Sequence, residues 1–592
     1  MARCERSLDG TWQFRIDREE QGLAQGWHGP DCDTDKWLSV PVPGNWDAYL
    51  PELFGYAGHG WYRTTFRLDR KGQGQRGIGA IHLRFEGANY ETSVWLNGTP
   101  VGSHSGGFDP FEFDITELLD SEGENALAVR VDNWPKLGRV PNSYGGWWNY
   151  GGIYRSVKLV SVPDVRVEDV FVRAAPAEGQ EPALLSVDVT IMNESSGPVE
   201  LSVRGQVRDD ATSGSRPAQD SPVAGDPGAV VALRGQLAAP AVVVGPGDVL
   251  KVTLSAGMPA PKLWSPNSPS LYRLDVTLMR GGAAIDEREV TFGVRRFEVC
   301  GTQLFLNGDP IVLCGFNRHE EYAGTGRVDP GGGLEADLRL TKELNGNMVR
   351  MHYQAHPDLY DFADRMGLLV FAEIPLWGVG NRDVTELTDP GVREVAERML
   401  RTLIAELKNH PSVVIWSVGN ECATNKPESR PLIGHLAQVA RSLDSTRPVA
   451  YVGMFGPAEQ CFDLVDLPGI NVYFGKRLGE LGGFVDMVHD LTPDKPLLIT
   501  EFGHEAVLGL RGEGYGSEDE QAYVLERKWE IFKERRAFVP GGLIWCLADY
   551  WHMPAGPEFR WMNRIYFCHG VTTLARRPKQ ATGVINRMWG DA

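Results

Sequence analysis

The chain has 592 residues, too many for a single hydrophobic core, so we expect about three or four domains. Its hydrophobic content of 42% is typical of a folded soluble protein, and its net charge of −19 argues against nucleic acid or an anionic membrane as partner. The eight cysteines show no CxxC spacing, and residues 1–6 hold no apolar segment of a secretion signal. These features predict reduced thiols and a cytoplasmic location.

Residues 1–163 have the pattern of an all-β domain. Apolar and polar residues alternate in Ile81–Phe85 and again in Leu127–Val131, as in strands with one buried face. Between them, Ser93–Leu96 is followed by Asn97-Gly98, a strong signal for a tight hairpin. Turn-rich stretches separate these segments, so we expect a jelly roll in this region.

Residues 164–297 continue the β pattern with short strands at Leu185–Ile191, Leu201–Val203 and Leu274–Leu278. Several short strands in a region of this length predict an immunoglobulin-like β-sandwich. The stretch from Asp209 to Gly228 is rich in Ser, Gly, Pro and Asp, which predicts a long surface loop.

Residues 298–592 change to strands that alternate with helical stretches such as Val392–Leu407. Eight apolar runs have the length of buried strands: Ile311–Asn317, Asn347–Met351, Leu368–Ile374, Val413–Val418, Pro448–Met454, Gly469–Phe474, Pro496–Thr500 and Gly541–Leu547. Eight strand–helix units in about 295 residues predict a (β/α)8 TIM barrel.

Two of these strands lead into a glutamate, Glu421 after the fourth and Glu501 at the end of the seventh. The carboxyl ends of all barrel strands meet on one face, so both carboxylates should enter one pocket. Two such carboxylates are the minimum equipment for retaining glycoside hydrolysis. A charged residue closing one apolar strand is more often an ordinary solvated loop position. The occurrence of both in one predicted barrel favours the catalytic interpretation.

Short motifs along the whole chain resemble those of glycoside hydrolase family 2, which includes β-glucuronidases and β-galactosidases. The motifs are Asn149–Arg155, Phe292–Arg295, Gly315–Glu320, Gly367–Pro375, Gly419–Glu421 and Thr500–Gly503. The resemblance implies a jelly roll, an immunoglobulin-like sandwich and a catalytic barrel. It also implies a retaining exo-β-glycosidase that uses no cofactor and is commonly a homo-oligomer.

The resemblance assigns roles to several residues. Glu421 would be the acid/base, Glu501 the nucleophile and Asn420 the partner of the sugar 2-hydroxyl. Tyr473 would position the nucleophile, although a buried tyrosine there also suits core packing. The resemblance further implies a sugar subsite lined by His319, His352 and Trp545. Arg350 and Glu373 close the second and third predicted strands and would help to hold the pocket together. A metal site at His319, Glu320 and His352 lacks HExxH spacing, so we expect no metal.

The chain departs from the family at the position that recognises a uronic acid. Glucuronidases carry an Asn-x-Lys pair whose lysine binds the sugar carboxylate, whereas this chain has Phe567 and His569 at those positions. Histidine does not provide the fixed charge of a lysine. Arg560 and Arg564 lie nearby in the sequence and are candidate replacements, or they are simply solvated.

Two further departures concern the approach to the sugar. The family aspartate that reaches the sugar from the first domain is Gly146 here, which gives the neighbouring Trp147 and Trp148 greater importance as substrate-binding candidates. The segment from Arg350 to His352 is one residue shorter than the family spacing. The reaction type is therefore predicted more firmly than the sugar.

Several alternatives remain open at this point. The substrate would be a carbohydrate or glycoconjugate: a β-glucuronide, a β-galacturonide, a β-galactoside, or a glycoside of a pentose or furanose. A non-catalytic carbohydrate-binding protein and a metal-dependent barrel hydrolase are the other classes. The aglycone would be recognised by variable loops such as Gly378–Thr388 and Gly503–Gly516.

Overall fold

The computed structural model describes residues 3–68, 79–136, 138–141, 146–176, 182–210, 228–475, 477–553 and 565–590. The chain forms two compact units. The first contains Met1–Trp134, Tyr150–Trp264 and Ser270–Val294, and the second contains Pro135–Asn149, Ser265–Pro269 and Arg295–Ala592. Within the described ranges, no helix is both long enough and apolar enough to cross a membrane.

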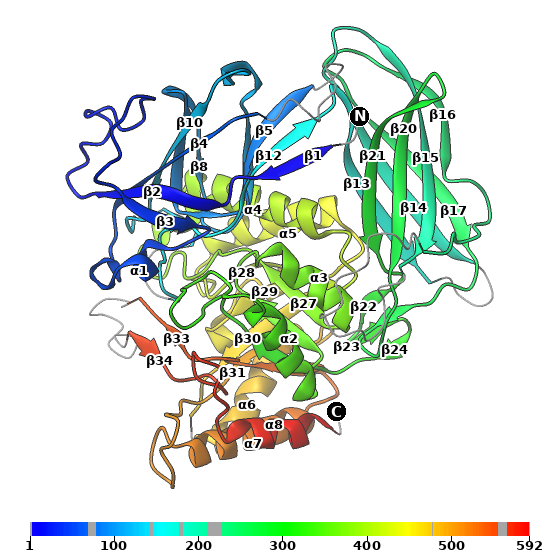
Figure 1. Ribbon diagram of the computed structural model, residues 1–592. Coiled ribbons are helices and arrows are strands. Elements are labelled where there is room, and N and C mark those ends of the chain that lie inside the picture. The colour runs from blue at the N-terminus through cyan, green and yellow to red at the C-terminus, as the bar shows by residue number, and fades with distance from the viewer. Residues whose placement is uncertain are drawn as a thin grey trace. The chain divides into compact units, whose positions relative to one another are not determined.

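The N-terminal part of the first unit is a β-sandwich with a four-stranded and a six-stranded sheet (Figure 1). The four-stranded sheet has the order β1 (Cys4–Ser7), β12 (Val157–Val162), β5 (Ala80–Phe85), β9 (Phe111–Asp114). The six-stranded sheet has the order β3 (Leu38–Val42), β2 (Gly10–Asp17), β4 (His59–Phe66), β10 (Asn125–Asp132), β7 (Glu91–Leu96), β8 (Thr99–Ser105). Two short strands, β6 (Ala88–Asn89) and β11 (Gly152–Ile153), pair separately, and three short helices are α1 (Trp46–Tyr49), η1 (Pro51–Leu53) and η2 (Thr116–Leu118).

The predicted hairpin joins β7 to β8 through Asn97 and Gly98, which both have positive φ, 53° and 81°. Positive φ at both central residues is the requirement of a type I′ turn, and Asn-Gly meets it at low cost. The hairpin prediction is therefore confirmed.

Between the two sheets, aromatic and aliphatic side chains such as Trp12, Trp46 and Tyr62 form a continuous core.

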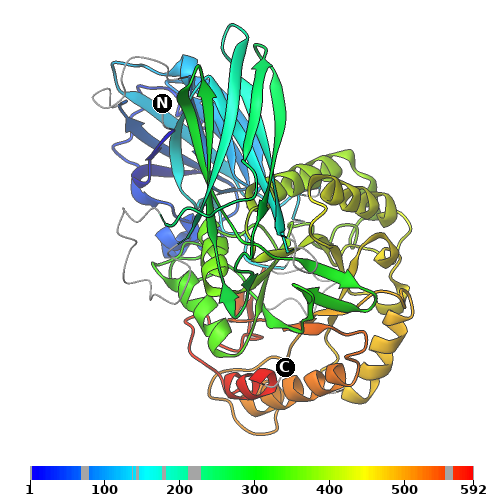
Figure 2. The same ribbon diagram turned by 90° about the vertical axis from the view of Figure 1, so that its right-hand side faces the viewer.

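The second sandwich of this unit packs a three-stranded sheet against a four-stranded one (Figure 2). The smaller sheet has the order β13 (Val165–Ala175), β14 (Ala183–Asn193), β17 (Val249–Met258), and the larger has the order β16 (Ala238–Val244), β15 (Val199–Asp209), β20 (Tyr272–Arg280), β21 (Ala283–Phe292). The three predicted strands lie within β14, β15 and β20. Most of the loop predicted between residues 209 and 228 lies outside the described residues.

The second unit is built around a closed barrel of eight parallel strands, so the predicted TIM barrel is confirmed. The strands are β25 (Leu313–Asn317), β26 (Met348–Met351), β27 (Leu369–Glu373), β28 (Val413–Asn420), β29 (Val449–Gly453), β30 (Leu467–Val472), β31 (Leu498–Phe502) and β32 (Gly541–Ile544). Every residue of these strands is buried, which explains their continuous apolar sequences.

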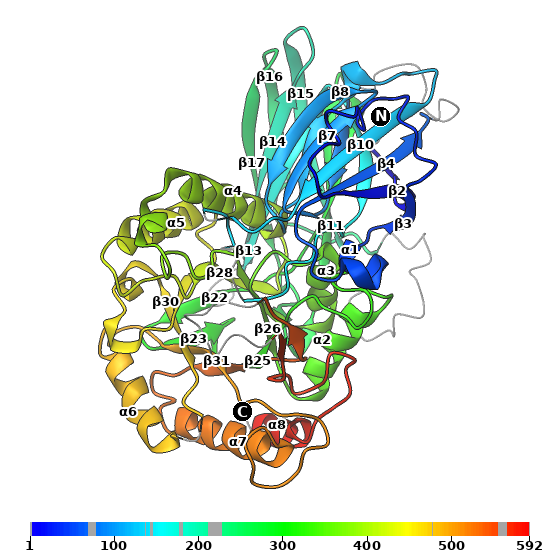
Figure 3. The ribbon, with the colours of Figure 1, turned by 90° about the vertical axis from the view of Figure 1, so that its left-hand side faces the viewer.

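Helices cover the outside of the barrel; Figure 3 shows α6, α7 and α8 there. The α-helices are α2 (Gly333–Glu343), α3 (Pro357–Met366), α4 (Pro390–Leu407), α5 (Ser429–Leu443), α6 (Leu478–His489), α7 (Glu518–Lys533) and α8 (Ala581–Gly590). Their ends follow from sequence: α3 starts with Pro357 and stops at Gly367, whose φ is 70°. The hydroxyl of Ser517 accepts from the amide of Glu520 and so caps α7.

One crossover differs from the regular pattern. Residues 454–466, between β29 and β30, form only the short helices η4 (Gly456–Ala458) and η5 (Phe462–Leu464). The connection is short, and Gly456 and Pro457 near its start disfavour the interior of an α-helix. The remaining short elements are β18 (Trp264–Ser265), β19 (Ser268–Pro269), β22 (Phe297–Cys300), β23 (Gln303–Leu306), β24 (Asp309–Pro310), β33 (Tyr550–Trp551), β34 (Tyr566–Phe567) and η3 (Val384–Thr388).

Candidate active site

Polar and charged side chains gather where the barrel strands end. The residues that share this face are Asn317 (β25), Arg350 (β26), Glu373 (β27), Asn420 (β28), Asn471 (β30) and Glu501 (β31). Each is at least nine-tenths buried. Buried groups of this kind are stable only when they satisfy one another, and here they form one continuous network.

Arg350 is the centre of this network and has no exposed surface. Its Nη2 donates to both carboxylate oxygens of Glu373 at 3.0 Å, and its Nη1 donates to Oε1 of Glu501 at 2.9 Å. The same guanidinium donates to the Oδ1 atoms of Asn317 and Asn420 at 3.0 and 2.9 Å. One fixed positive charge therefore connects two glutamates with the end of β28.

Glu501 accepts hydrogen bonds on both carboxylate oxygens. Besides Arg350 on Oε1, the hydroxyl of Tyr473 donates to Oε2 at 2.5 Å. Nε2 of His352 lies 3.4 Å from Oε1. Burial raises the pKa of Glu501, and the neighbouring charge of Glu421 adds to the effect, while Arg350 and Tyr473 act in the opposite direction.

Glu421 is the first residue after β28, and its backbone is left-handed, with φ of 53°. This conformation is unusual for a residue other than glycine and is typical of functional sites. Its Oε1 accepts from Nδ2 of Asn471 at 2.8 Å and its Oε2 from the indole nitrogen of Trp377 at 3.2 Å. Burial is the main reason that the pKa of Glu421 is raised.

The two glutamates differ in the donors that they face. Glu501 receives a hydrogen bond from the cation Arg350, whereas both side-chain donors to Glu421 are neutral. Because both pKa values are raised, the pair retains a proton at a pH where isolated carboxyls have lost theirs. The contact with Arg350 favours charge on Glu501 and therefore a proton on Glu421.

Aromatic rings and histidines line one side of this face. The ring of Trp147 lies 5.6 Å from that of His319 and 6.1 Å from that of His352. Trp545 lies 5.3 and 5.1 Å from the same two imidazoles, immediately after the end of β32. Burial lowers the pKa of His319 well below its ordinary value and that of His352 to about 4, so both rings are neutral near pH 7.

The remaining predicted residues lie at the edge of this group or elsewhere. His569 packs edge-on against Tyr473, with ring centres 6.1 Å apart, and its Nδ1 is 3.9 Å from a carboxylate oxygen of Glu505. Trp148 contacts Trp551 instead, at 6.3 Å. The predicted Arg560 and Arg564 lie outside the described residues.

Asn471 and Trp377 contact Glu421 but were not among the residues predicted from sequence. Asn471 had a usable signal, because it is a polar residue inside the apolar strand β30, two positions before Tyr473. Trp377 had none, since it belongs to the irregular loop after β27. Ser417 was also missed; its hydroxyl donates to Glu373 at 2.7 Å.

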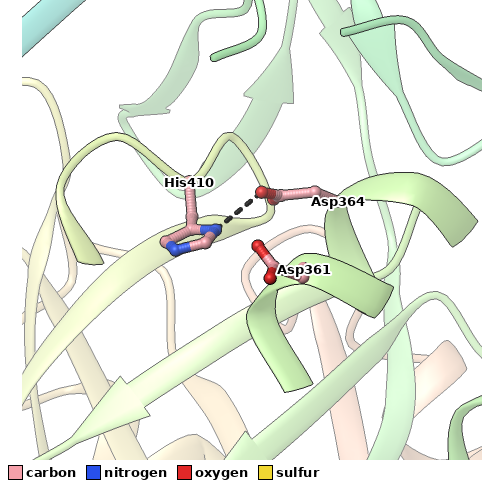
Figure 4. A group of neighbouring side chains, drawn as sticks. All are labelled: Asp361, Asp364 and His410. Carbon is pink, nitrogen blue, oxygen red and sulfur yellow. Dashed lines mark hydrogen bonds and ion pairs between the residues drawn. The ribbon is translucent and has the colours of Figure 1, made fainter. Parts of the chain in front are cut away.

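Figure 4 shows a second group of ionisable side chains, Asp361, Asp364 and His410. Nδ1 of His410 lies 2.7 Å from Oδ2 of Asp364, whose Oδ1 accepts from the amide of Ser412. Ser412 directly precedes β28, so the group lies at the amino end of the strands, away from Glu421 and Glu501. These contacts give the group a structural role, because they join α3 to the segment that leads into β28.

Three family models cover the chain. "Glycosyl hydrolases family 2, sugar binding domain" matches residues 5–163, "Glycosyl hydrolases family 2" matches 165–295, and "Glycosyl hydrolases family 2, TIM barrel domain" matches 297–590. The fold and these matches place the chain among the glycoside hydrolases. It belongs to glycosyl hydrolase family 2, as the sequence motifs predicted.

The relatives of known name differ in how much of their own length this chain covers. A β-glucuronidase from Paenibacillus borealis is 28% identical over 99% of this chain and 97% of its own length. A β-galactosidase from Vibrio vulnificus is 29% identical over 92% of this chain, but the chain spans only 50% of that protein. Among solved structures, a β-glucuronidase from Ruminococcus gnavus is 26% identical with a TM-score of 0.84, covering 99% of this chain and 98% of the other.

A β-galacturonidase from Eisenbergiella tayi, solved with galacturonate bound, has a TM-score of 0.83 over 100% of this chain and 98% of its own. Its 24% identity supports the shared fold alone. Together, the named relatives agree with an exo-β-glycosidase and differ in the sugar that they accept.

Proposed function

We propose that the protein is a retaining exo-β-glycosidase in which Glu501 is the nucleophile and Glu421 the acid/base. The observation that carries the proposal is the unequal environment of the two carboxylates: Glu501 is paired with Arg350, and Glu421 is held by neutral donors. A nucleophile must be ionised and a general acid protonated, and this arrangement supports that division.

In the first step, Glu501 attacks the anomeric carbon and forms an ester bond to it. The bond between the anomeric carbon and the glycosidic oxygen breaks, and that oxygen takes the proton of Glu421. In the second step, Glu421, now ionised, removes a proton from water. The water oxygen bonds to the anomeric carbon, and Glu501 leaves with the electron pair of the ester. Two inversions give a product with retained configuration.

Asn420 is proposed to bind the sugar 2-hydroxyl. Its Oδ1 accepts from Arg350 at 2.9 Å and from Nδ2 of Asn471 at 3.2 Å. These two donors fix which end of the amide is the oxygen, so the amide nitrogen is the end left to donate to a hydroxyl. Such a contact strengthens in the transition state. Tyr473 is proposed to hold Glu501 in line for attack.

The neutral imidazoles of His319 and His352 and the rings of Trp147 and Trp545 are proposed to contact the sugar. Aromatic faces pack against the apolar C–H face of a pyranose, while an imidazole nitrogen accepts or donates one hydrogen bond to a hydroxyl. Nε2 of His319 is buried, and no described residue hydrogen-bonds to it, which supports a ligand contact at this nitrogen.

The surroundings of His569 favour a neutral sugar over a uronic acid as the substrate. Burial lowers the pKa of His569 to about 4, so the ring is uncharged near pH 7, and the carboxylate of Glu505 is its neighbour. A sugar carboxylate gains no ionic attraction from an uncharged ring and is repelled by Glu505. The alternative, a uronide, is supported by the β-glucuronidase relative that matches along its full length.

The test is a set of initial rates on matched aryl β-glycosides, including glucuronide, galacturonide, galactoside, glucoside, arabinoside and galactofuranoside. A neutral glycoside preferred by tenfold or more supports the proposal for the sugar. A uronide preferred by that margin overturns it and directs attention to Arg560 and Arg564. Aglycone recognition by the loops 378–388 and 503–516 and a homo-oligomeric assembly stay predictions.

A further inference from the structure

Backbone hydrogen bonds join the loop after β27 to the end of β28 and to the residues that follow it. The amide of Asn420 donates to the carbonyl of Leu376 at 2.9 Å, and the amide of Gly378 donates back to the carbonyl of Asn420 at 3.1 Å. Further on, the amide of Ala423 donates to Val379 at 2.9 Å. These backbone bonds extend the pairing of β27 and β28 beyond the barrel, so the loop is built onto the segment that carries the acid/base.

The loop also contacts Glu421 directly at two points. Nδ2 of Asn381 donates to the backbone carbonyl of Glu421 at 2.7 Å, and the indole nitrogen of Trp377 donates to its Oε2 at 3.2 Å. The first bond supports the left-handed backbone of Glu421, and the second sets the rotation of its carboxyl group. The other carboxylate oxygen is held by Asn471 from β30.

The indole of Trp377 lies beside the backbone of Gly146. A Cβ added at Gly146 would lie 3.4 Å from the indole ring, and the φ of 82° at this position disfavours any side chain. The amide of Gly146 donates to Nε2 of His552 at 2.9 Å, which fixes this backbone. The position where the family resemblance placed a sugar-binding aspartate is thus coupled to a tryptophan that contacts the acid/base.

We propose that Trp377 is a positioning residue for the acid/base, acting through its hydrogen bond to Glu421. The inference rests on the proposed function, because it assigns Glu421 its role. The other charged and titratable groups that influence Glu421 are Arg350, Glu373, Glu459, Tyr473 and Glu501. The side chain of Trp377 contacts Glu421, Trp147 and Gly146 rather than any of these groups, so an effect of a change at Trp377 on the protonation of Glu421 is separable from theirs.

The test is Trp377→Phe, which keeps an aromatic ring and removes the donor. Loss of a donor to the ionised carboxylate raises the pKa of Glu421, so the basic limb of the kcat/KM profile should move to higher pH by about 0.5 to 1 unit. Rates on glycosides with a poor leaving group should fall about tenfold more than rates on dinitrophenyl glycosides, which need little proton donation.

Trp147→Phe is the matched control, because Trp147 packs on Trp377 at 6.2 Å and is not a donor to Glu421. It should change rates without moving the basic limb. An unmoved limb and an equal loss on both leaving groups in Trp377→Phe would overturn the inference. Glu421→Ala is measured in parallel: if it retains turnover of poor leaving groups, the proposed function itself fails, whatever Trp377→Phe shows.

Discussion

Nη1 of Arg350 lies 2.9 Å from Oε1 of Glu501, and the arginine side chain is completely buried. A buried cation with this many carboxylate and amide partners is costly to place unless the whole network forms. The same guanidinium holds Glu373 and Asn420, so the charge of the proposed nucleophile, the pocket wall and the end of β28 depend on one side chain.

Replacement of this cation tests the network. Arg350→Met should lower kcat by at least about 100-fold, because Glu501 loses the charge that keeps it ionised. It should also destabilise the fold by about 3–5 kcal/mol, since Glu373 is left buried without its partner. Activity per folded molecule and the thermal midpoint are the two measurements.

Arg447→Met is the control, because Arg447 is also buried and pairs with Asp444 at 2.6 Å. Its other hydrogen bonds go to Thr446 and to the carbonyls of Lys408, His410 and Val413, at the amino end of β28 and away from Glu501. It should lower the thermal midpoint and leave kcat within a few fold. Equal losses of kcat in the two variants would contradict a specific role for Arg350.

Replacement of Tyr473 by phenylalanine should lower activity and have little effect on stability. Its side chain is 44% exposed, so Tyr473→Phe should alter the free energy of unfolding by no more than about 0.5 kcal/mol. Loss of a hydrogen bond to a charged group should lower kcat by roughly 10- to 100-fold. Tyr523→Phe removes the hydroxyl of another exposed tyrosine, on α7, and should leave kcat nearly unchanged. Similar rates for both variants would remove Tyr473 from the proposed machinery.

His569 offers a test of the sugar preference. His569→Lys places a charged amine beside Glu505, where the family resemblance places the uronate-binding lysine. The ratio of uronide to neutral glycoside turnover should rise roughly tenfold or more, as expected for a new charge-assisted contact. His569→Gln has similar bulk without charge and should not raise the ratio. A rise with glutamine as well would mean that the charge at this position does not decide the sugar.

Lys528 gives the barrel a pH-dependent stability. Its side chain on α7 is fully buried with Nζ donating to the carbonyl of Gly503 at 3.0 Å, and burial lowers its pKa to about 7 from 10.5. Between these values the unfolded chain binds more protons than the folded one, so stability should increase with pH by up to about 1.4 kcal/mol per unit.

Lys528→Met removes the titrating group and keeps the length of the side chain. The variant should have a higher thermal midpoint than the wild type at pH 7, and the difference should shrink toward pH 10. Unfolding curves from pH 6 to 10 measure this. A constant difference across that range would mean that Lys528 does not titrate in it.

The barrel could be predicted from sequence because its strands are buried on every face, and such strands have continuous apolar runs that end in polar residues. Arg350, Glu421 and Glu501 were found in this way, at or beside the ends of their strands. Tyr473 and Trp545 were located to within one residue of the observed strand ends. The length of each apolar run and the polar residues that flank it carry this information, and no tertiary contact is needed to read it.

What escaped prediction depends on tertiary contacts. Trp377 reaches Glu421 only because its loop pairs with the end of β28, and irregular loops have no periodic signal. A lysine on a helix is usually exposed to solvent, yet the fold buries Lys528. Eight strand–helix units were expected, but the fifth crossover, residues 454–466, forms only the short helices η4 and η5.

The most direct test of the central claim is to trap the glycosyl-enzyme. The protein is incubated with the activated 2-deoxy-2-fluoro analogue of its best aryl glycoside, and the intact mass and the labelled peptide are determined. A retaining mechanism through Glu501 predicts one fluoro-sugar per chain, attached to Glu501, with loss of activity that recovers when an acceptor releases the sugar. A label on another residue, or full turnover of the analogue with no adduct and an inverted product, would contradict it.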